Sequence, residues 1–278
     1  MSHSAFQSGN VAVVTGGASG IGLAAAQKLA AMGLLLIIVD LGTDRLQAAA
    51  ETIARSVPGA VIITHETDVS DRSAWVDLLA LVQVHGGADV LMNNAAISPG
   101  SSALDPAGWA ATLDVNLMGV IYGTQTLAPA MLSSGKSGLI INTGSKQGIT
   151  TPPGNPAYNV AKAGVKVFTE AVQHELRNTP GCEVTAHLFV PGFVWTGMTA
   201  RGRTEKPDSA WTPEQTIDFM IEGVNRGDFY ILCPDGETTR ALDEKRMAWA
   251  MGDIIENRPP LSRWHPDYAD AWRAWLDN

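Results

Sequence analysis

The sequence predicts an α/β fold: a doubly wound parallel sheet of about seven strands, with helices on both faces, in a single domain. Short apolar runs recur along the chain, and such runs are typical of strands that are buried on both faces. Stretches of helical length separate them, which is the alternation expected of a parallel sheet. The 278 residues contain no internal repeat or linker, and this length suits one α/β domain.

The first strand–helix–strand unit carries a pattern suited to a dinucleotide. Residues 11–15 form an apolar run, a glycine-rich turn spans 16–22, a helix follows over 23–32, and a second strand over 34–39 ends at Asp40. Glycines let the backbone approach a pyrophosphate, and the helix N-terminus offers N–H donors. Asp40 can accept hydrogen bonds from an adenosine ribose and would repel a 2′-phosphate. This Rossmann-type unit therefore favours NAD(H) over NADP(H).

The alternation continues through a core of about residues 9–235. Further strands are expected over 61–66, 89–92, 138–143, 183–190 and 229–232, and further helices over 43–56, 71–85, 109–132, 158–178, 212–226 and 238–255. Thr43 is expected to cap its helix, and Thr212 with Pro213 to open another. Residues 193–211 suit a mobile substrate lid with short helices. Residues 237–278 form a helical, tryptophan-rich extension that should pack on something.

Composition excludes several classes of function. The net charge of -9, with lysine and arginine scattered, argues against a nucleic-acid partner. The two cysteines, Cys182 and Cys233, have no metal-like spacing, so no metal site is expected. No apolar run approaches 18 residues and the first ten residues lack a secretory pattern, so we expect a soluble, cytoplasmic protein without a membrane partner.

Tyr158 and Lys162 are the pair of residues most suggestive of chemistry. At positions i and i+4 of the helix expected over 158–178, they share one face. A nearby ammonium favours the phenolate and would lower the pKa of the phenol from about 10. Such a tyrosine can exchange protons at physiological pH. Taken alone, the spacing is more often that of a surface tyrosine and a solvated lysine.

Several motifs in fixed order carry a resemblance to a known family. They are Thr15-Gly16-x-x-x-Gly20-Ile21-Gly22, Asp68-Val69, Asn93-Asn94-Ala95, Asn116, Ser145, Tyr158-x-x-x-Lys162 and Pro191-Gly192. With these motifs the chain resembles the classical short-chain dehydrogenases/reductases from residue 11 to about residue 197. It departs from the usual pattern at Ala96, where many members carry glycine, and at Gly144, where a serine is frequent.

The resemblance implies roles for individual residues. Tyr158 would be the general acid/base, Ser145 would stabilise the substrate oxygen, Lys162 would lower the pKa of Tyr158 and bind the nicotinamide ribose, and Asn116 would hold a proton-relaying water. Asn93 would brace the sheet. For Asn116, a polar residue satisfied by a neighbouring element is the alternative. The implied cofactor contacts are Gly16, Ser19, Gly20, Ile21, Gly22, Asp40, Leu41, Asp68, Val69, Asn94, Ala95, Ala96, Tyr158, Lys162, Pro191, Gly192, Val194 and Thr196.

The resemblance also implies a reaction: interconversion of a secondary alcohol and a ketone with NAD(H). Substrate contacts are expected at Ser145, Gln147, Tyr158, Phe193, Trp195 and Met198, and the aromatic ones suggest an apolar or aromatic substrate. Two alternatives stay open. In the first, Arg45 would favour NADP(H), and Arg201 and Arg203 would favour a charged or sugar-like substrate. In the second, the chain would be a non-catalytic nucleotide sensor. Family members pair through the helices expected at 109–132 and 158–178, which implies a homotetramer or homodimer.

Overall fold

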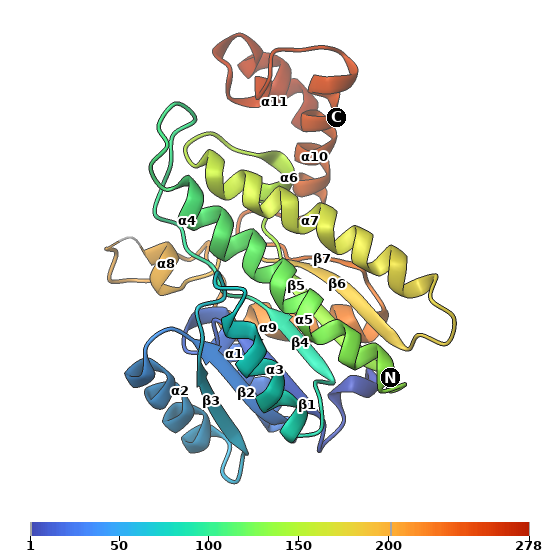
Figure 1. Cartoon of the computed structure of the whole chain (residues 1–278). Helices are drawn as coiled ribbons and strands as arrows, with labels where there is room; N and C mark the ends of the chain where they lie inside the picture. Colours follow the sequence, from blue (N-terminus) through green and yellow to red (C-terminus); the bar gives the residue numbers. More distant parts are fainter. Residues whose placement is uncertain (1, 201, 278) are drawn as a thin grey trace.

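A seven-stranded parallel sheet forms the centre of the computed structural model, which describes residues 2–200 and 202–277 (Figure 1). The strand order is β3-β2-β1-β4-β5-β6-β7, which confirms the doubly wound α/β fold. The strands are β1 Val11–Thr15, β2 Leu35–Asp40, β3 Ile62–Glu66, β4 Val90–Asn93, β5 Gly138–Thr143, β6 Val184–Val190 and β7 Tyr230–Leu232. The order reverses between β1 and β4, so a crevice opens at their carboxyl ends.

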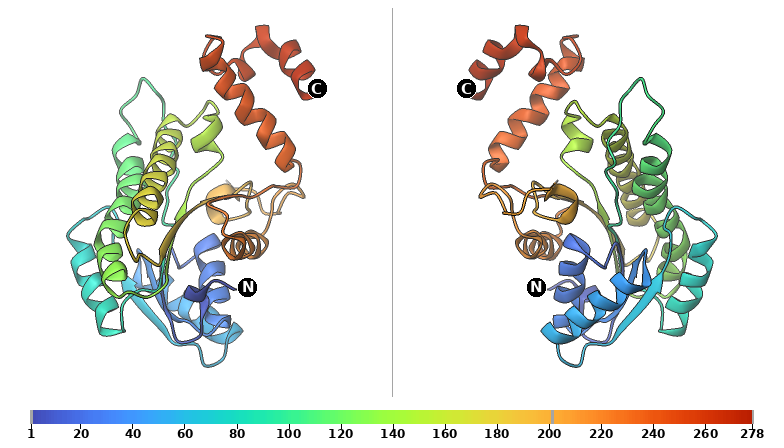
Figure 2. Two further views of the ribbon diagram at one scale, coloured as in Figure 1. Left: turned by 90° about the vertical axis from the view of Figure 1, so that its right-hand side faces the viewer. Right: turned by 90° about the vertical axis from the view of Figure 1, so that its left-hand side faces the viewer.

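Helices cover both faces of this sheet (Figure 2). The α-helices are α1 Gly20–Ala31, α2 Thr43–Ser56, α3 Ala74–Val84, α4 Trp109–Leu113, α5 Gly119–Ser133, α6 Gln147–Thr150, α7 Pro156–Arg177, α8 Gly197–Ala200, α9 Pro213–Arg226, α10 Arg240–Ile255 and α11 Ala269–Asp277. Short helical turns are η1 Ser4–Phe6, η2 Asp114–Met118, η3 Ser262–Trp264 and η4 Pro266–Tyr268.

The core consists of layers on the two faces of the sheet. Side chains alternate along β1, so that Val11 and Val13 pack beneath α3 and α5, while Ala12 and Val14 pack beneath α1 and α9. A third cluster, which includes Val165 of α7, fills the space over β6 and β7. Because both faces are covered, the strands read as continuous apolar runs.

Two helix boundaries differ from expectation. Thr43 is not the N-cap of α2. The N-cap is Gly42, which has φ 91. The Gly42 N–H and the Thr43 hydroxyl both donate to the Glu66 carboxylate, and these bonds hold the turn one residue before Thr43. The helix expected over 109–132 is interrupted by the π-helical turn η2, in which the Gly119 N–H donates to the Asp114 carbonyl five residues back.

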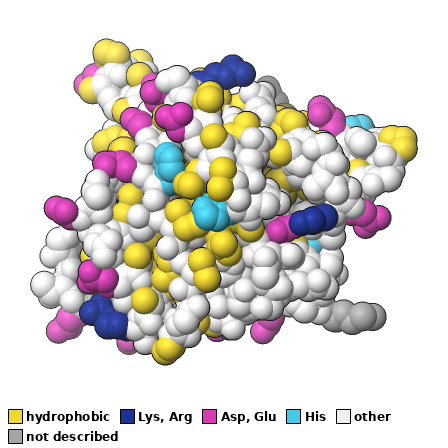
Figure 3. Space-filling model, turned by 60° about the horizontal axis from the view of Figure 1, so that its bottom comes forward, with side chains coloured by type: hydrophobic (Ala, Val, Ile, Leu, Met, Phe, Trp, Pro, Cys, Tyr) yellow, Lys and Arg dark blue, Asp and Glu magenta, His cyan; other side chains and the backbone are white. Residues whose placement is uncertain are grey.

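The other boundaries agree with the sequence to within three residues; α3, for example, begins at Ala74 and not at Asp71. The residue pair Thr212–Pro213 opens α9 as expected, with a capping box completed by Gln215. α6 was not expected, since its four residues lie in a segment rich in glycine and proline. Within the described residues, none of the helices has both the length and the apolar character needed to cross a membrane. On the face drawn in Figure 3, lysine and arginine side chains are few and stand apart, so this face has no basic patch.

Candidate active site

Parallel strands bring the motif residues to one edge of the sheet. The glycine turn follows β1, Asp40 ends β2, Asn93 ends β4, Ser145 follows β5, and Pro191 follows β6. Because all seven strands run the same way, their carboxyl ends lie at the same edge. Residues that are up to about 180 positions apart in the sequence are therefore assembled around one crevice.

The glycine turn is a close-packed cradle that side chains would fill. A Cβ at Gly16, which has φ 65, would lie 2.9 Å from the Ala95 Cα, and one at Gly22 would lie 2.1 Å from the Gly16 carbonyl oxygen. Ser19 is the N-cap of α1, yet its side chain makes no capping hydrogen bond. The first-turn N–H groups of α1 thus face the glycine turn without a side-chain cap, as a pyrophosphate site requires.

Asp40 is held in place beside this turn. One carboxylate oxygen accepts from the Ala18 N–H (3.0 Å) and the other from the Leu41 N–H (2.8 Å). Arg45 places a guanidinium nitrogen 3.6 Å from Asp40, on a side chain that is 58% exposed. The anionic group at the end of β2 is therefore oriented by the backbone, while the nearby cation is largely in solvent.

The other expected cofactor contacts lie around the same crevice. The Asp68 carboxylate accepts from the Ser70 N–H and hydroxyl, at 2.9 and 2.6 Å. The neighbouring Val69 carbonyl accepts from the Trp75 indole N–H at 3.1 Å. Thr196 lies against Gly20, where a Cβ would approach its methyl group to 3.1 Å. The start of the lid thus touches the glycine turn.

The two asparagines after β4 have different roles. Asn93 donates to Asn142 of β5 at 2.8 Å and to Thr124 of α5 at 3.1 Å, so it braces the sheet as expected. Asn94 donates its backbone N–H to the Thr15 hydroxyl at 2.9 Å and its side-chain amide to the Thr15 carbonyl at 3.2 Å. Asn94 therefore fixes the end of β1, where the glycine turn begins.

Tyr158 lies in the first turn of α7, next to the Ser145 side chain. The start of α7 is fixed by the Ser101 hydroxyl, which donates to the Asn155 side chain and accepts the Ala157 N–H at 2.9 Å. Burial raises the pKa of the Tyr158 phenol, and the neighbouring Ser145 side chain partly opposes this rise. The structure thus brings together the side chains expected to act as the acid/base and as the oxygen-stabilising hydroxyl.

Lys162 is fully buried below the phenol. Its ammonium donates to the Thr143 carbonyl at 2.8 Å and lies 5.8 Å from the centre of the Tyr158 ring. Burial lowers the pKa of Lys162 from 10.5 to about 8. The lowering of the Tyr158 pKa by Lys162 stays a prediction. The largest influence on the phenol in this structure is desolvation, which raises its pKa.

Asn116 sits in the π-helical turn η2 and is fully buried. Its amide donates to the Ile97 carbonyl at 2.8 Å and accepts the Ile97 N–H at 2.7 Å. The side chain therefore holds the loop after β4 against the helix, which is the alternative that the sequence left open. The water-holding role of Asn116 stays a prediction.

The expected substrate residues lie on two segments. Gln147 begins α6, and its N–H donates to the Ser145 hydroxyl at 3.2 Å. Trp195 pairs by its N–H with the Trp211 carbonyl at 2.8 Å, so the two ends of the lid are joined. Met198 of α8 is 41% exposed.

Of the lid arginines, Arg201 lies outside the described residues. Arg203 donates to the carbonyls of Ala200 and Thr199, at 3.2 and 3.0 Å, and lies over the Phe193 ring. Its guanidinium thus closes the end of α8.

A buried ion cluster next to Ser145 was not expected from the sequence. The Lys146 ammonium lies 2.6 Å from an Asp243 carboxylate oxygen and 3.1 Å from one of Asp235. The same Asp235 oxygen accepts the Phe193 N–H at 3.2 Å. The cluster links the segment that carries Ser145, the lid and the C-terminal extension.

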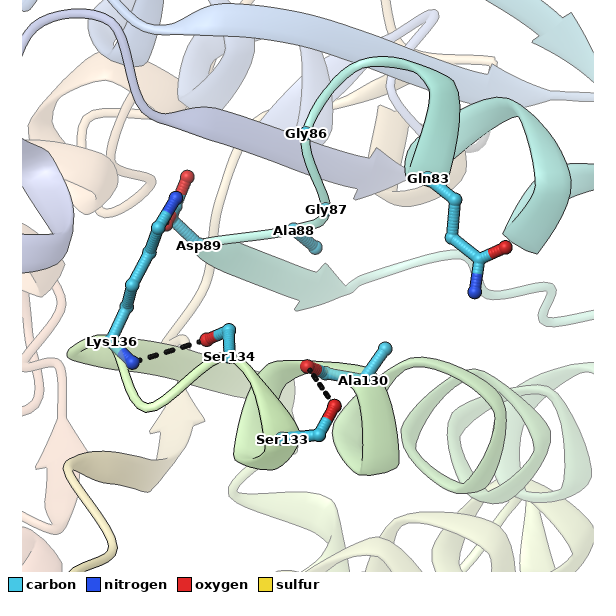
Figure 4. A pocket seen from close by; sticks show the side chains of 9 residues that line it. All are labelled: Gln83, Gly86, Gly87, Ala88, Asp89, Ala130, Ser133, Ser134 and Lys136. Carbon is cyan, nitrogen blue, oxygen red and sulfur yellow. Dashed lines mark hydrogen bonds and ion pairs between the residues drawn. The ribbon is translucent and has the colours of Figure 1, made fainter.

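A cavity of about 330 Å³ lies at the opposite edge of the sheet (Figure 4). It is bordered by Gly86, Gly87 and Asp89 before β4 and by Lys136 before β5. The Asp89 carboxylate accepts a hydrogen bond from the Val11 N–H at 2.8 Å. None of the motif residues borders this cavity, so it is separate from the candidate active site.

Known proteins are similar to this chain in sequence and in structure. The model of the short chain dehydrogenase family matches residues 10–207. The 3-oxoacyl-(acyl-carrier-protein) reductase FabG of Thermotoga maritima is 34% identical over 196 residues, which cover 69% of this chain and 77% of the relative.

Solved structures extend the similarity over most of the chain. A short chain dehydrogenase/reductase from Burkholderia phymatum in complex with NAD has a TM-score of 0.78 and 31% identity, and the match covers 92% of this chain and 97% of that one. A metagenomic short-chain oxidoreductase in complex with NADP has a TM-score of 0.67 and 28% identity, with 82% and 98% covered. The chain thus belongs to the short-chain dehydrogenase family and is an oxidoreductase of that family.

Proposed function

We propose that this protein interconverts a secondary alcohol and a ketone with NAD(H), acting on an apolar or aromatic substrate. The observation that carries the proposal is that Tyr158 lies next to Ser145 and over the buried Lys162 ammonium. A phenol and a hydroxyl placed next to each other can both bind one substrate oxygen.

In this proposal each side chain has one task. Bound NAD(H) supplies or accepts the hydride. Tyr158 gives its proton to the carbonyl oxygen during reduction and takes it back during oxidation. Because burial raises the pKa of Tyr158, the phenol is protonated at neutral pH, as a general acid must be. Ser145 donates a hydrogen bond to the same oxygen as negative charge develops there, which is worth a few kcal/mol in comparable sites.

The glycine turn, Asp40 and the Asp68–Val69 pair would hold the dinucleotide. Asp40 supports NAD(H), since its carboxylate is oriented by two backbone N–H groups and would repel a 2′-phosphate. The second candidate is NADP(H) specificity, which Arg45 favours because its guanidinium is 3.6 Å from Asp40 and could swing toward a phosphate. Initial rates measured with each cofactor separately decide between them.

The protein is proposed to work as a homotetramer or homodimer built through α7. Val160 and Val167 of this helix are 48% and 63% exposed and lie seven residues apart, so they share one face. A second copy would cover them. A sedimentation mass equal to one chain would contradict this assembly.

The direct test of the reaction is Tyr158→Phe. With a panel of secondary alcohols, ketones, hydroxysteroids and sugars, we expect turnover to fall at least roughly 100-fold, because general acid–base catalysis contributes about 10²–10⁴-fold. NADH binding, followed by fluorescence, should survive. Tyr122→Phe removes the same hydroxyl from α5 and serves as the control. Near-normal turnover by Tyr158→Phe would refute the assigned acid/base, and cofactor binding without turnover by the wild type would favour a nucleotide sensor.

A further inference from the structure

A cavity of about 200 Å³ lies between α6 and the C-terminal extension. Figures 1 and 2 show α10 beside α6, with the rest of the extension folded above it. The walls of the cavity include Thr150, Thr151, Arg246, Trp249, Arg263 and Trp264. The cavity therefore combines two guanidinium groups with two indole rings.

The cavity is near the candidate active site along the chain. α6 begins two residues after Ser145, and it packs directly on α7, since a Cβ at Gly148 would lie 2.4 Å from the Lys162 backbone. The six steps from Ser145 to Thr151 include a short helix, so they span at most about 15 Å. The cavity wall at Thr151 is therefore within the length of an elongated substrate from Ser145.

The two arginines present unused hydrogen-bonding capacity. The Arg246 Nε is buried without a hydrogen-bond partner in the described part of the chain. Arg263 stacks on the Trp264 and Trp272 rings, at 4.8 and 5.0 Å, and forms no salt bridge within residues 2–200 and 202–277. Burial, followed by the positive charge of Arg246, lowers the pKa of Arg263 to about 10. An anion bound between the two guanidinium groups would give the Arg246 Nε a hydrogen-bond partner and would offset the repulsion between the two positive charges.

Lys146, Arg246 and Arg263 face two carboxylates, Asp235 and Asp243. In a second group nearby, Arg258 pairs with Asp253 of the cavity wall at 3.0 Å and with the largely exposed Glu256. The charges of the two groups together cancel, so a singly charged carboxylate fits the cavity better than a doubly charged phosphate.

Backbone strain is concentrated at the same place. Thr151 has φ 44 and Leu261 has φ 59, and both residues line the cavity. They are two of the three non-glycine residues with positive φ in the described chain. Left-handed backbone is unusual for a β-branched or bulky residue and tends to persist where a binding site requires it.

We propose that this cavity binds the carboxylate end of an elongated aromatic or apolar substrate, with Arg246 and Arg263 as the carboxylate ligands. Trp249 and Trp264 flank the apolar part. The volume equals about seven water molecules, at about 30 Å³ each, which is room for one aromatic ring with its carboxylate. The proposal rests on the proposed function for the carbonyl end and adds a substrate class to it.

Binding is tested first, with calorimetry on the whole protein and 4-phenylbutyrate as the probe. We expect the acid to bind about tenfold more tightly than 4-phenylbutyramide, because hydrogen bonds to charged groups add that much affinity. Arg246→Gln and Arg263→Gln should abolish the difference. Arg240→Gln, which removes an exposed arginine from the same helix, should keep it. Equal binding of acid and amide, or a preference that survives in both cavity variants, overturns the proposal.

Kinetics then separate the cavity from the reaction. Aryl ketones with a carboxylate at increasing distance from the carbonyl are compared with their methyl esters. For the acid of best length, Arg263→Gln should raise KM about tenfold with kcat little changed, and the ester should be unaffected. Turnover of acids and esters with equal KM refutes the carboxylate site and leaves the proposed reaction intact. Carboxylate-selective binding without turnover of any ketone supports the site and refutes the reaction.

Discussion

Replacing Lys162 by methionine tests the energetic cost of the buried ammonium. The side chain is almost fully buried and donates to the Thr143 carbonyl. Burial lowers its pKa from 10.5 to about 8. At 1.36 kcal/mol per pKa unit, keeping this group charged in the folded protein costs about 3 kcal/mol.

The sign of the pH dependence follows from proton binding. Between about pH 8 and 10.5 the unfolded chain holds a proton on Lys162 that the folded protein has released. The free energy of unfolding therefore rises with pH across this window. Below pH 8 both states are protonated and the full cost is present. Methionine has no proton to bind, so the variant lacks this contribution.

Urea unfolding of both proteins, at one protein concentration and at several pH values from 7 to 11, measures the effect. The free energy of unfolding of the wild type minus that of Lys162→Met should increase by about 3 kcal/mol from pH 7 to pH 10.5. Lys166→Met, on the same helix but partly exposed and paired with Glu170, controls for the loss of a lysine. A difference that stays constant across this range would refute the assignment of a buried, destabilised ammonium.

Three further substitutions probe the cofactor site and the ion cluster. Asp40→Ser should lower kcat/KM for NAD roughly tenfold, since it removes a ribose acceptor and a repulsive charge. The ratio of kcat/KM for NAD to kcat/KM for NADP should therefore fall, and an unchanged ratio contradicts the role of Asp40. Gly22→Ala would place a Cβ 2.1 Å from a backbone oxygen, so NADH binding should be lost, and retained affinity in a fluorescence titration argues against the cradle. Lys146→Met leaves Asp235 and Asp243 without their cation, and should cost about 3 kcal/mol of unfolding free energy in urea; a loss below about 0.5 kcal/mol means that the cluster is well solvated.

The sheet and the placement of Tyr158 and Lys162 on one helix could be predicted because their signals are local. Val11 to Thr15 reads as a buried strand from five consecutive residues, and it forms β1 with those bounds. Tyr158 and Lys162 share a helix face by spacing alone, and α7 places them so. The spacing does not predict whether burial or a neighbouring charge has the larger effect on a pKa. The direction of the Tyr158 pKa depends on how much solvent the surrounding elements remove, and these come from the whole chain.

Contacts between residues far apart along the chain could not be predicted from the sequence, for a related reason. Lys146 meets Asp235, which lies 89 residues later along the chain. No periodicity relates the two, because the contact depends on where β7 and α10 leave the sheet. The π-helical turn at Asn116 is similar: its amide is fixed by Ile97, a loop residue that only the folded chain brings near.

In the proposed function, substrate choice would have a different structural origin from the reaction. Ser145, Tyr158 and Lys162 lie on β5 and α7, or directly beside them, and the packed sheet sets their positions. Arg246 and Arg263 lie on the extension, which joins the sheet edge through the Lys146 cluster and through α6. If the proposed site is correct, a change in the extension would alter which molecule binds near Tyr158 while the geometry around Tyr158 and Ser145 stays intact. For this reason the arginine variants are expected to change KM for acids and to leave kcat for esters unchanged.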